Sequence, residues 1–212
     1  MHAAVLQSKC VLIILLSVIV SVFSTGQKCL ACTNISRPWF CDNYIHCEEG
    51  EICHIRKIST RNGHVQYTSG CISDRSCAVD GSLHGSFGTP YGHVTCVECC
   101  NGDFCNNKGC GDPGPPGRDM RGPLCFRCDN MTSSVNCRTL TSCSSDQVCS
   151  INKSMVDGSS VFTSGCVLKT TCPQPQYLLG RDAASREQDQ PASLCHSCCS
   201  NDYCNTECQR SF

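Results

Sequence analysis

The sequence predicts an all-β protein made of two small, disulfide-rich domains in tandem. Three observations carry this prediction: a very high cysteine content, a twelve-cysteine spacing that occurs twice, and a hairpin turn at the same place in each copy. The chain has 212 residues, of which 25 are cysteine. Residues 27–212 contain no apolar stripe with helical spacing, so the regular structure is expected to be β.

The first 26 residues have the pattern of a secretory signal peptide. The apolar run VLIILLSVIVSVF is followed by the small residues Ser24, Thr25 and Gly26. A membrane anchor is the rival interpretation, but this run is well short of the ~20 residues that cross a bilayer. Cleavage after residue 26 would remove Cys10 and leave 24 cysteines in 186 residues, about 13%. Because ~8 to 10% already marks a disulfide scaffold, we expect an oxidising compartment and a secreted, extracellular protein.

In the remaining chain, one pattern of twelve cysteines occurs twice. The first copy, in residues 27–110, has the spacing C-x2-C-x8-C-x5-C-x5-C-x17-C-x5-C-x18-C-x2-CC-x4-CN-x3-C. The second copy, in residues 125–212, has C-x2-C-x8-C-x5-C-x5-C-x16-C-x5-C-x22-C-x2-CC-x4-CN-x2-C. Such self-similarity indicates a duplicated domain, and we call the copies module one and module two. Residues 111–124, GDPGPPGRDMRGPL, are expected to form an extended Pro/Gly linker between two semi-independent modules.

Each module has a strong hairpin signal between its fifth and sixth cysteines. In module one, β-branched and aromatic residues flank Asn62-Gly63, and in module two similar residues flank Asp157-Gly158. Both dipeptides favour the positive φ angles of two-residue hairpin turns. We call these segments the second hairpins of the two modules.

The full spacing resembles the three-finger superfamily, most closely domains of the lymphocyte antigen 6 and urokinase-receptor (UPAR/LU) type. The likeness rests on the opening C-x2-C and the closing CC-x4-CN, and it covers both modules. It implies a snake-toxin-like all-β fold, in which a knot of disulfides holds three β-hairpin fingers. Asn106 and Asn205 match the terminal asparagine of that family, so we expect them to be structural.

The resemblance also implies a disulfide pairing, which spacing alone would leave open. In module one it joins Cys29 to Cys53, Cys32 to Cys41, Cys47 to Cys71, Cys77 to Cys99, and Cys100 to Cys105. In module two it joins Cys125 to Cys149, Cys128 to Cys137, Cys143 to Cys166, Cys172 to Cys198, and Cys199 to Cys204.

Two cysteines in each module depart from the ten-cysteine family pattern. By elimination they pair as Cys96 with Cys110 and Cys195 with Cys208. Side chains alternate along a strand, so Cys96 should share a face with Cys100, four residues later. The extra bridge is therefore expected to tie down the tail of each module.

The other functional classes find little support. Repeated C-x2-C pairs would suit zinc or redox chemistry, but the disulfide scheme uses every cysteine after cleavage. The seven histidines have no equivalents between the copies, and no catalytic constellation is recognisable. A net charge of -1 gives no electrostatic footprint for nucleic acid. We expect no enzyme activity, cofactor or metal.

Surface features suggest where a partner could bind. Glycosylation sequons start at Asn34, Asn130 and Asn152, the last of them in the second hairpin of module two. The second hairpin of module one has no sequon and carries the basic residues Arg56, Lys57, Arg61 and His64. We expect this hairpin to be the partner-binding site, against the simpler interpretation of a solvated charged hairpin.

The predicted function is that of an extracellular binding protein. Relatives implied by the resemblance include inhibitors of secreted phospholipase A2 and modulators of receptors and ion channels, so an extracellular protein of unknown identity is the expected partner. Only four residues follow Cys208, too few for a glycolipid-anchor signal, so no membrane anchor is expected. The alternative is a structural glycoprotein of matrix, mucus or egg coat. The third-finger segments differ most between the copies, as two different partners would require.

Overall fold

The computed structural model describes residues 26–77, 88–89, 92–172 and 193–208. The expected signal peptide, except its last residue, and most of both third-finger segments lie outside this part of the chain. The described residues form antiparallel strands joined by turns and single helical turns, so the predicted all-β, disulfide-rich class is confirmed. No helix in the described part is long and apolar enough to span a membrane.

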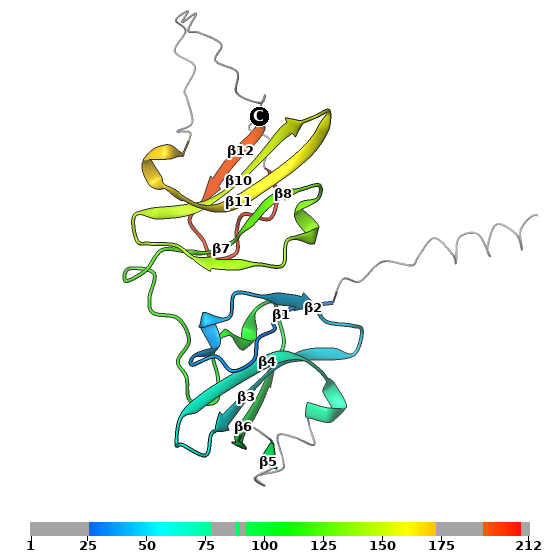
Figure 1. Ribbon diagram of the computed structural model, residues 1–212, viewed down its shortest axis with the longest axis vertical. Coiled ribbons are helices and arrows are strands. Elements are labelled where there is room, and N and C mark those ends of the chain that lie inside the picture. The colour runs from blue at the N-terminus through cyan, green and yellow to red at the C-terminus, as the bar shows by residue number, and fades with distance from the viewer. Residues whose placement is uncertain (1–25, 78–87, 90–91, 173–192, 209–212) are drawn as a thin grey trace, which may run out of the picture.

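Module one contains a small sheet and a larger one (Figure 1). The small sheet pairs β1 (Lys28–Leu30) with β2 (Tyr44–His46). The larger sheet has the order β4-β3-β6-β5. Its strands are β3 (Glu51–Ser59), β4 (Val65–Ser73), β5 (Gly88–Thr89) and β6 (Gly92–Cys100).

Module two repeats the small sheet and the three main strands of the larger one, but its fourth strand is β8 of the first finger, which pairs with β11. Its small sheet pairs β7 (Leu124–Phe126) with β9 (Leu140–Ser142). Its larger sheet has the order β12-β10-β11-β8. These strands are β8 (Cys128–Met131), β10 (Gln147–Val156), β11 (Ser159–Leu168) and β12 (Ser193–Cys199).

Twelve disulfides hold the two modules, and all of them lie within a module. They join the same pairs that the resemblance and elimination imply, including Cys96 to Cys110. Strand β6 pairs with β3 so that Cys100 lies opposite Cys53 and Cys96 lies opposite Lys57. Cys96 and Cys100 therefore share a face, and the additional bridge fastens the tail over it.

In each module, the side chain of one buried asparagine makes hydrogen bonds to backbone groups of both sheets. Asn106 has no exposed surface, its Oδ1 accepts a hydrogen bond from the Leu30 amide, and its Nδ2 donates to the carbonyls of Leu30 and His54. Asn205 makes the same three bonds to Phe126 and Ser150. Each side chain thus joins the small sheet to the larger one, as its expected structural role requires.

The modules share a hydrophobic cluster and are not semi-independent, which corrects the sequence-based expectation. Four positions of each module contribute to it. They are the residue after the first cysteine, the third cysteine, the residue three places beyond it, and the residue before the last cysteine of CC-x4-C. In module one these are Leu30, Cys41, Tyr44 and Phe104, and in module two Phe126, Cys137, Leu140 and Tyr203.

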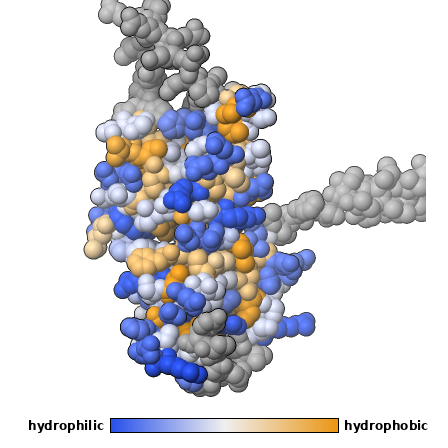
Figure 2. All heavy atoms as spheres, in the orientation of Figure 1, coloured by the Kyte–Doolittle hydropathy of each residue, from blue (hydrophilic) through white to orange (hydrophobic). Residues whose placement is uncertain are grey.

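Equivalent residues meet across this interface, so a pseudo-two-fold axis relates the modules. The rings of Phe104 and Tyr203, which hold the same position, stack with centroids 4.0 Å apart. Asn43 and Thr139, also equivalent, form an antiparallel bridge that joins the two small sheets. Such reciprocal contacts define an isologous interface. On the face drawn in Figure 2, hydrophobic and hydrophilic residues are interspersed over both modules.

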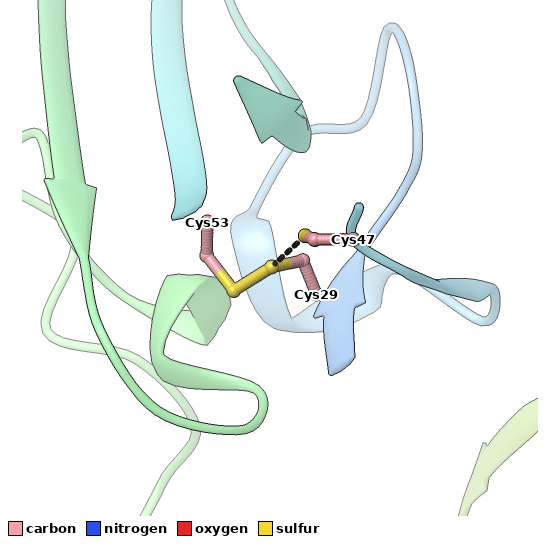
Figure 3. A group of neighbouring side chains, drawn as sticks. All are labelled: Cys29, Cys47 and Cys53. Atoms are coloured by element: carbon pink, nitrogen blue, oxygen red, sulfur yellow. Dashed lines mark hydrogen bonds between the residues drawn. A yellow bond between two sulfur atoms is a disulfide. The ribbon is translucent and has the colours of Figure 1, made fainter. Parts of the chain in front are cut away.

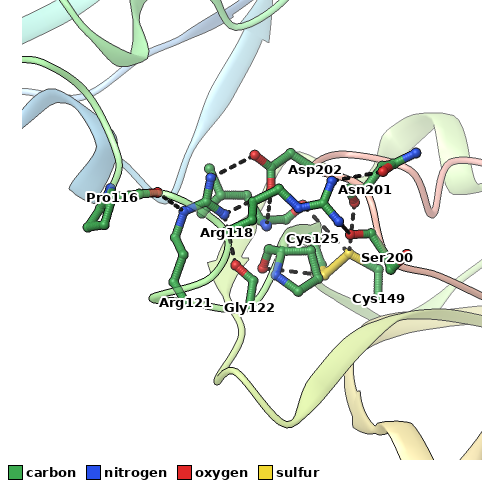
Figure 4. Close-up of polar contacts among 11 residues, drawn as sticks. Pro116, Arg118, Arg121, Gly122, Cys125, Cys149, Ser200, Asn201 and Asp202 are labelled. Carbon is green, nitrogen blue, oxygen red and sulfur yellow. Dashed lines mark hydrogen bonds and ion pairs between the residues drawn. A yellow bond between two sulfur atoms is a disulfide. The ribbon is translucent and has the colours of Figure 1, made fainter.

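The linker is bound to module two as well as connecting the modules. Arg121 donates two hydrogen bonds to the carboxylate of Asp202, at 2.8 and 2.7 Å, and Asp202 also accepts from the Leu124 amide (Figure 4). Arg118 donates to Asn201 and to the carbonyl of Ser200. A bidentate Arg–carboxylate pair fixes orientation as well as distance. We call the Arg121–Asp202 pair the linker clasp.

Acid is expected to weaken the linker clasp. Burial alone would raise the pKa of Asp202, but the hydrogen bonds from Arg121 and from the Leu124 amide outweigh it and hold that pKa below 3.8. A lowered pKa stabilises the fold above the unfolded-state value, and the contribution is lost as pH falls through the folded-state value. Asp202→Asn should therefore lose about 1 to 3 kcal/mol at neutral pH, and progressively less as pH falls below the unfolded-state pKa of the carboxyl.

The measurement is thermal unfolding of both proteins from pH 7 to pH 2. Asp119→Asn is the matched control, because Asp119 is an exposed carboxylate of the same linker. A difference between wild type and Asp202→Asn that stayed constant down to pH 2 would contradict the role given to this carboxylate.

Candidate binding surface

The sulfur atoms at the centre of each module are engaged in disulfides. In module one, Sγ of Cys29 is bonded to Cys53 and lies 2.9 Å from Sγ of Cys47, as Figure 3 shows, while Cys47 is itself bonded to Cys71. Metal binding needs a thiolate, and a disulfide sulfur is not one. The close grouping of sulfurs in the described residues is thus two bridges in contact.

The two second hairpins have different turns. In module two, Asp157 and Gly158 have φ angles of 48° and 76°, and Val156 pairs with Ser159, so the predicted two-residue turn is confirmed. In module one, positive φ is found at Gly63 but not at Asn62. The turn there is closed by the Thr60 amide, which donates to the His64 carbonyl at 2.8 Å. The loop has three residues, so the predicted two-residue turn is wrong in module one.

The structure separates the four basic residues expected at the binding site. Arg61 and His64 are exposed at the tip of the second hairpin. Arg56 and Lys57 lie farther back on β3 and are half-buried. As neighbours on a strand they point to opposite faces of the sheet. The four residues therefore do not form one patch. The exposed basic residues of this hairpin are the two at its tip, Arg61 and His64.

The position of Arg56 is occupied in module two by a sequon asparagine. Arg56 follows Cys53 by three residues, as Asn152 follows Cys149. Asn152 is half-buried on the central strand β10, between Thr163 and His196 in register. This is a strand site, whereas glycosylation acceptors are usually surface-loop residues. Glycosylation of Asn152 stays a prediction.

The other two sequons are open and equivalent. Asn34 and Asn130 are exposed, with φ angles of 57° and 52°. Both lie two residues beyond the second cysteine of their module. A glycan at either position would extend from the first finger. Their glycosylation likewise stays a prediction.

The tips of the two second hairpins differ in chemistry and direction. The tip in module one carries Arg61 and His64 beside Val65, whose side chain is exposed. The tip in module two carries Asp157 beside the exposed Met155 and Val156. In Figure 1 the β3–β4 hairpin and the β10–β11 hairpin point to opposite ends of the molecule. The protein thus presents a basic tip at one end and an acidic, apolar tip at the other.

No protein-family model matches the chain, and no curated protein sequence matches it. The likeness to UPAR/LU domains therefore rests on the cysteine spacing, with which the disulfide-rich all-β structure is compatible.

Sequence interpretation missed the surfaces that depend on contact between the modules. These are the aromatic interface, the linker clasp and the residues around them. One signal was present: Phe104 and Tyr203 place an aromatic ring directly before the same cysteine in both copies. A large ring kept at an equivalent position in a chain with few aromatic residues indicates a common contact.

Proposed function

We propose that the protein is a secreted, non-enzymatic binding protein of two three-finger modules of the UPAR/LU type. It contacts an extracellular protein through the tip of the second hairpin of module one. The observation that carries this proposal is the exposed basic pair Arg61 and His64 beside an exposed valine, Val65. The cysteine spacing and the twelve disulfides support the choice of fold family.

The chemistry of the tip indicates the kind of partner. Arg61 suits a carboxylate, and Val65 suits a small apolar contact beside it. Charge at the edge of an interface mainly raises the association rate, and buried apolar contact supplies the affinity. The partner is therefore a protein with acidic groups around an apolar contact site.

The test compares partner capture by wild type and by Arg61→Glu. The glycoprotein is used as bait in extracellular fluid, and captured proteins are eluted and quantified. Arg61→Glu should weaken binding about tenfold, and the wild-type association rate should fall as ionic strength rises.

Arg127→Glu is the matched control, because Arg127 is exposed in module two and the substitution makes the same change of charge. It should bind like wild type. Equal capture by wild type and Arg61→Glu would overturn the site. An insoluble protein that captures no partner would instead favour the structural role.

A further inference from the structure

A cavity of about 370 Å³ lies at the boundary of the modules. Its apolar wall includes Phe126, Ile151 and Phe162 from module two and Tyr44 from module one. This volume is within the ~300 to 1,000 Å³ range of small-molecule sites, which are mostly apolar with a few polar groups. The cavity is separate from the hairpin tip of module one, to which partner binding is assigned above.

The pseudo-two-fold axis explains why this cavity is open. The place related to it by the axis overlaps a smaller cavity of about 230 Å³, which is lined by Trp39, Leu140 and Ser142, the equivalents of Val135, Tyr44 and His46. Trp39 and the fully buried Pro38 are equivalent to Val135 and Ser134 in module two. Replacing Pro-Trp by Ser-Val removes an indole ring and a pyrrolidine ring from the wall. The larger cavity is thus built by small residues at two identified positions.

Basic groups surround the apolar wall. Each of its three aromatic rings has a cation over its face: Lys28 at 5.9 Å from the Phe126 centroid, Arg138 at 5.5 Å from Tyr44, and Lys153 at 5.3 Å from Phe162.

The described charged residues that line the cavity itself are Lys28 and Glu207, and Lys28 also pairs with Asp103 at 3.7 Å. His46 lines the cavity too, and its buried Nδ1 has no hydrogen-bond partner among the described residues.

We propose that this cavity binds a single-chain lipid with an anionic headgroup. The acyl chain lies against Phe126, Ile151 and Phe162, and the headgroup lies beside Lys28 and His46. Apolar walls favour the chain, and Lys28, with the two further cations that lie over the wall rings, favours a negative over a neutral headgroup. Fatty acids and lysophosphatidic acid share this chemistry.

The experiment is calorimetric titration of the full-length protein with oleate, with oleyl alcohol and with lysophosphatidic acid. Oleate should bind at least tenfold more tightly than the alcohol. Each methylene removed from the fatty acid should lower affinity about fourfold until the chain no longer fills the cavity. Comparison of the affinities for oleate and lysophosphatidic acid shows whether the cavity prefers a carboxylate or a phosphate headgroup.

The decisive variant copies the residues of module one into module two. Ser134→Pro with Val135→Trp should fill the cavity and lower oleate affinity at least tenfold. Proline fits there because Ser134 is the first residue of a short 3₁₀ turn, as Pro38 is in module one, and the amide of that residue is not needed for a hydrogen bond within the turn. Leu168→Trp, which adds the same ring at an exposed position outside the cavity, is the control and should bind oleate normally.

Lys28→Gln is a second, milder variant and should weaken oleate without affecting the alcohol. The absence of oleate and lysophosphatidic acid binding would overturn the proposal, as would unchanged binding by the filled variant. Equal affinity for oleate and oleyl alcohol would overturn the assignment of an anionic headgroup.

Discussion

Replacement of Asn106 by leucine is expected to destabilise the protein by about 3 to 5 kcal/mol. Leucine has nearly the same size but leaves the Leu30 amide and the carbonyls of Leu30 and His54 without their side-chain partner in a site that excludes water. Each buried polar group left unsatisfied costs about 1 to 3 kcal/mol. Thermal or denaturant unfolding with the disulfides intact measures the loss, and secreted yield should fall in parallel.

The duplicated fold supplies a repeat of this experiment. Asn205→Leu should cause a loss of similar size, because Asn205 makes the same three bonds in module two. Asn136→Leu is the control, since Asn136 is exposed, and it should change stability by less than ~0.5 kcal/mol. A loss below 1 kcal/mol at both buried positions would show that these asparagines do not hold the two sheets together.

Cutting the linker is expected to leave the modules bound to each other. No disulfide crosses between them, so among the described residues the fragments of a chain cut at Met120 are held by the interface and by the hydrogen bonds from Arg118 to Ser200 and Asn201. A protease site introduced at Met120, whose side chain is 75% exposed, would allow the cut in the folded protein. The two fragments should coelute at the size of the intact chain in gel filtration under non-reducing conditions.

Tyr203→Ser should separate the cut fragments. The Tyr203 ring stacks on Phe104, and burial raises the pKa of its hydroxyl to about 12. Loss of a large buried ring costs about 3 to 5 kcal/mol, which lowers association more than a hundredfold. Val65→Ser at the distant hairpin tip should have no effect. Separation of the cut wild-type fragments at micromolar concentration would contradict a stable interface.

The features of each module that depend on local spacing were predictable. Cysteine order and turn dipeptides determine the all-β class, the duplication and the two hairpins. The opposite faces of Arg56 and Lys57 also follow from alternation along a strand, although the four basic residues were first grouped by sequence alone. At Asn62-Gly63 the dipeptide favoured a two-residue turn, but the pairing of Thr60 with His64 extends the loop to three residues.

The features between the modules were not predictable from the same patterns. A Pro/Gly-rich composition indicates an extended linker. The linker nevertheless binds module two, because Arg121 donates hydrogen bonds to the carboxylate of Asp202, 81 residues later in the chain. Likewise the cavity depends on how Tyr44 of one module lies beside Phe126 of the other. Such long-range contacts leave no periodic signal in a single sequence.

Because one chain forms both halves of this pseudo-two-fold arrangement, equivalent positions can carry different residues, which is impossible in a homodimer. In a homodimer every substitution appears on both subunits, so both ends and both off-axis spaces must stay alike. Here the halves are encoded separately, and one end has become basic while the other is acidic and apolar. Trp39 lines the smaller of the two cavities and Val135 lines the larger. The molecule thus presents two chemically unlike surfaces at its opposite ends.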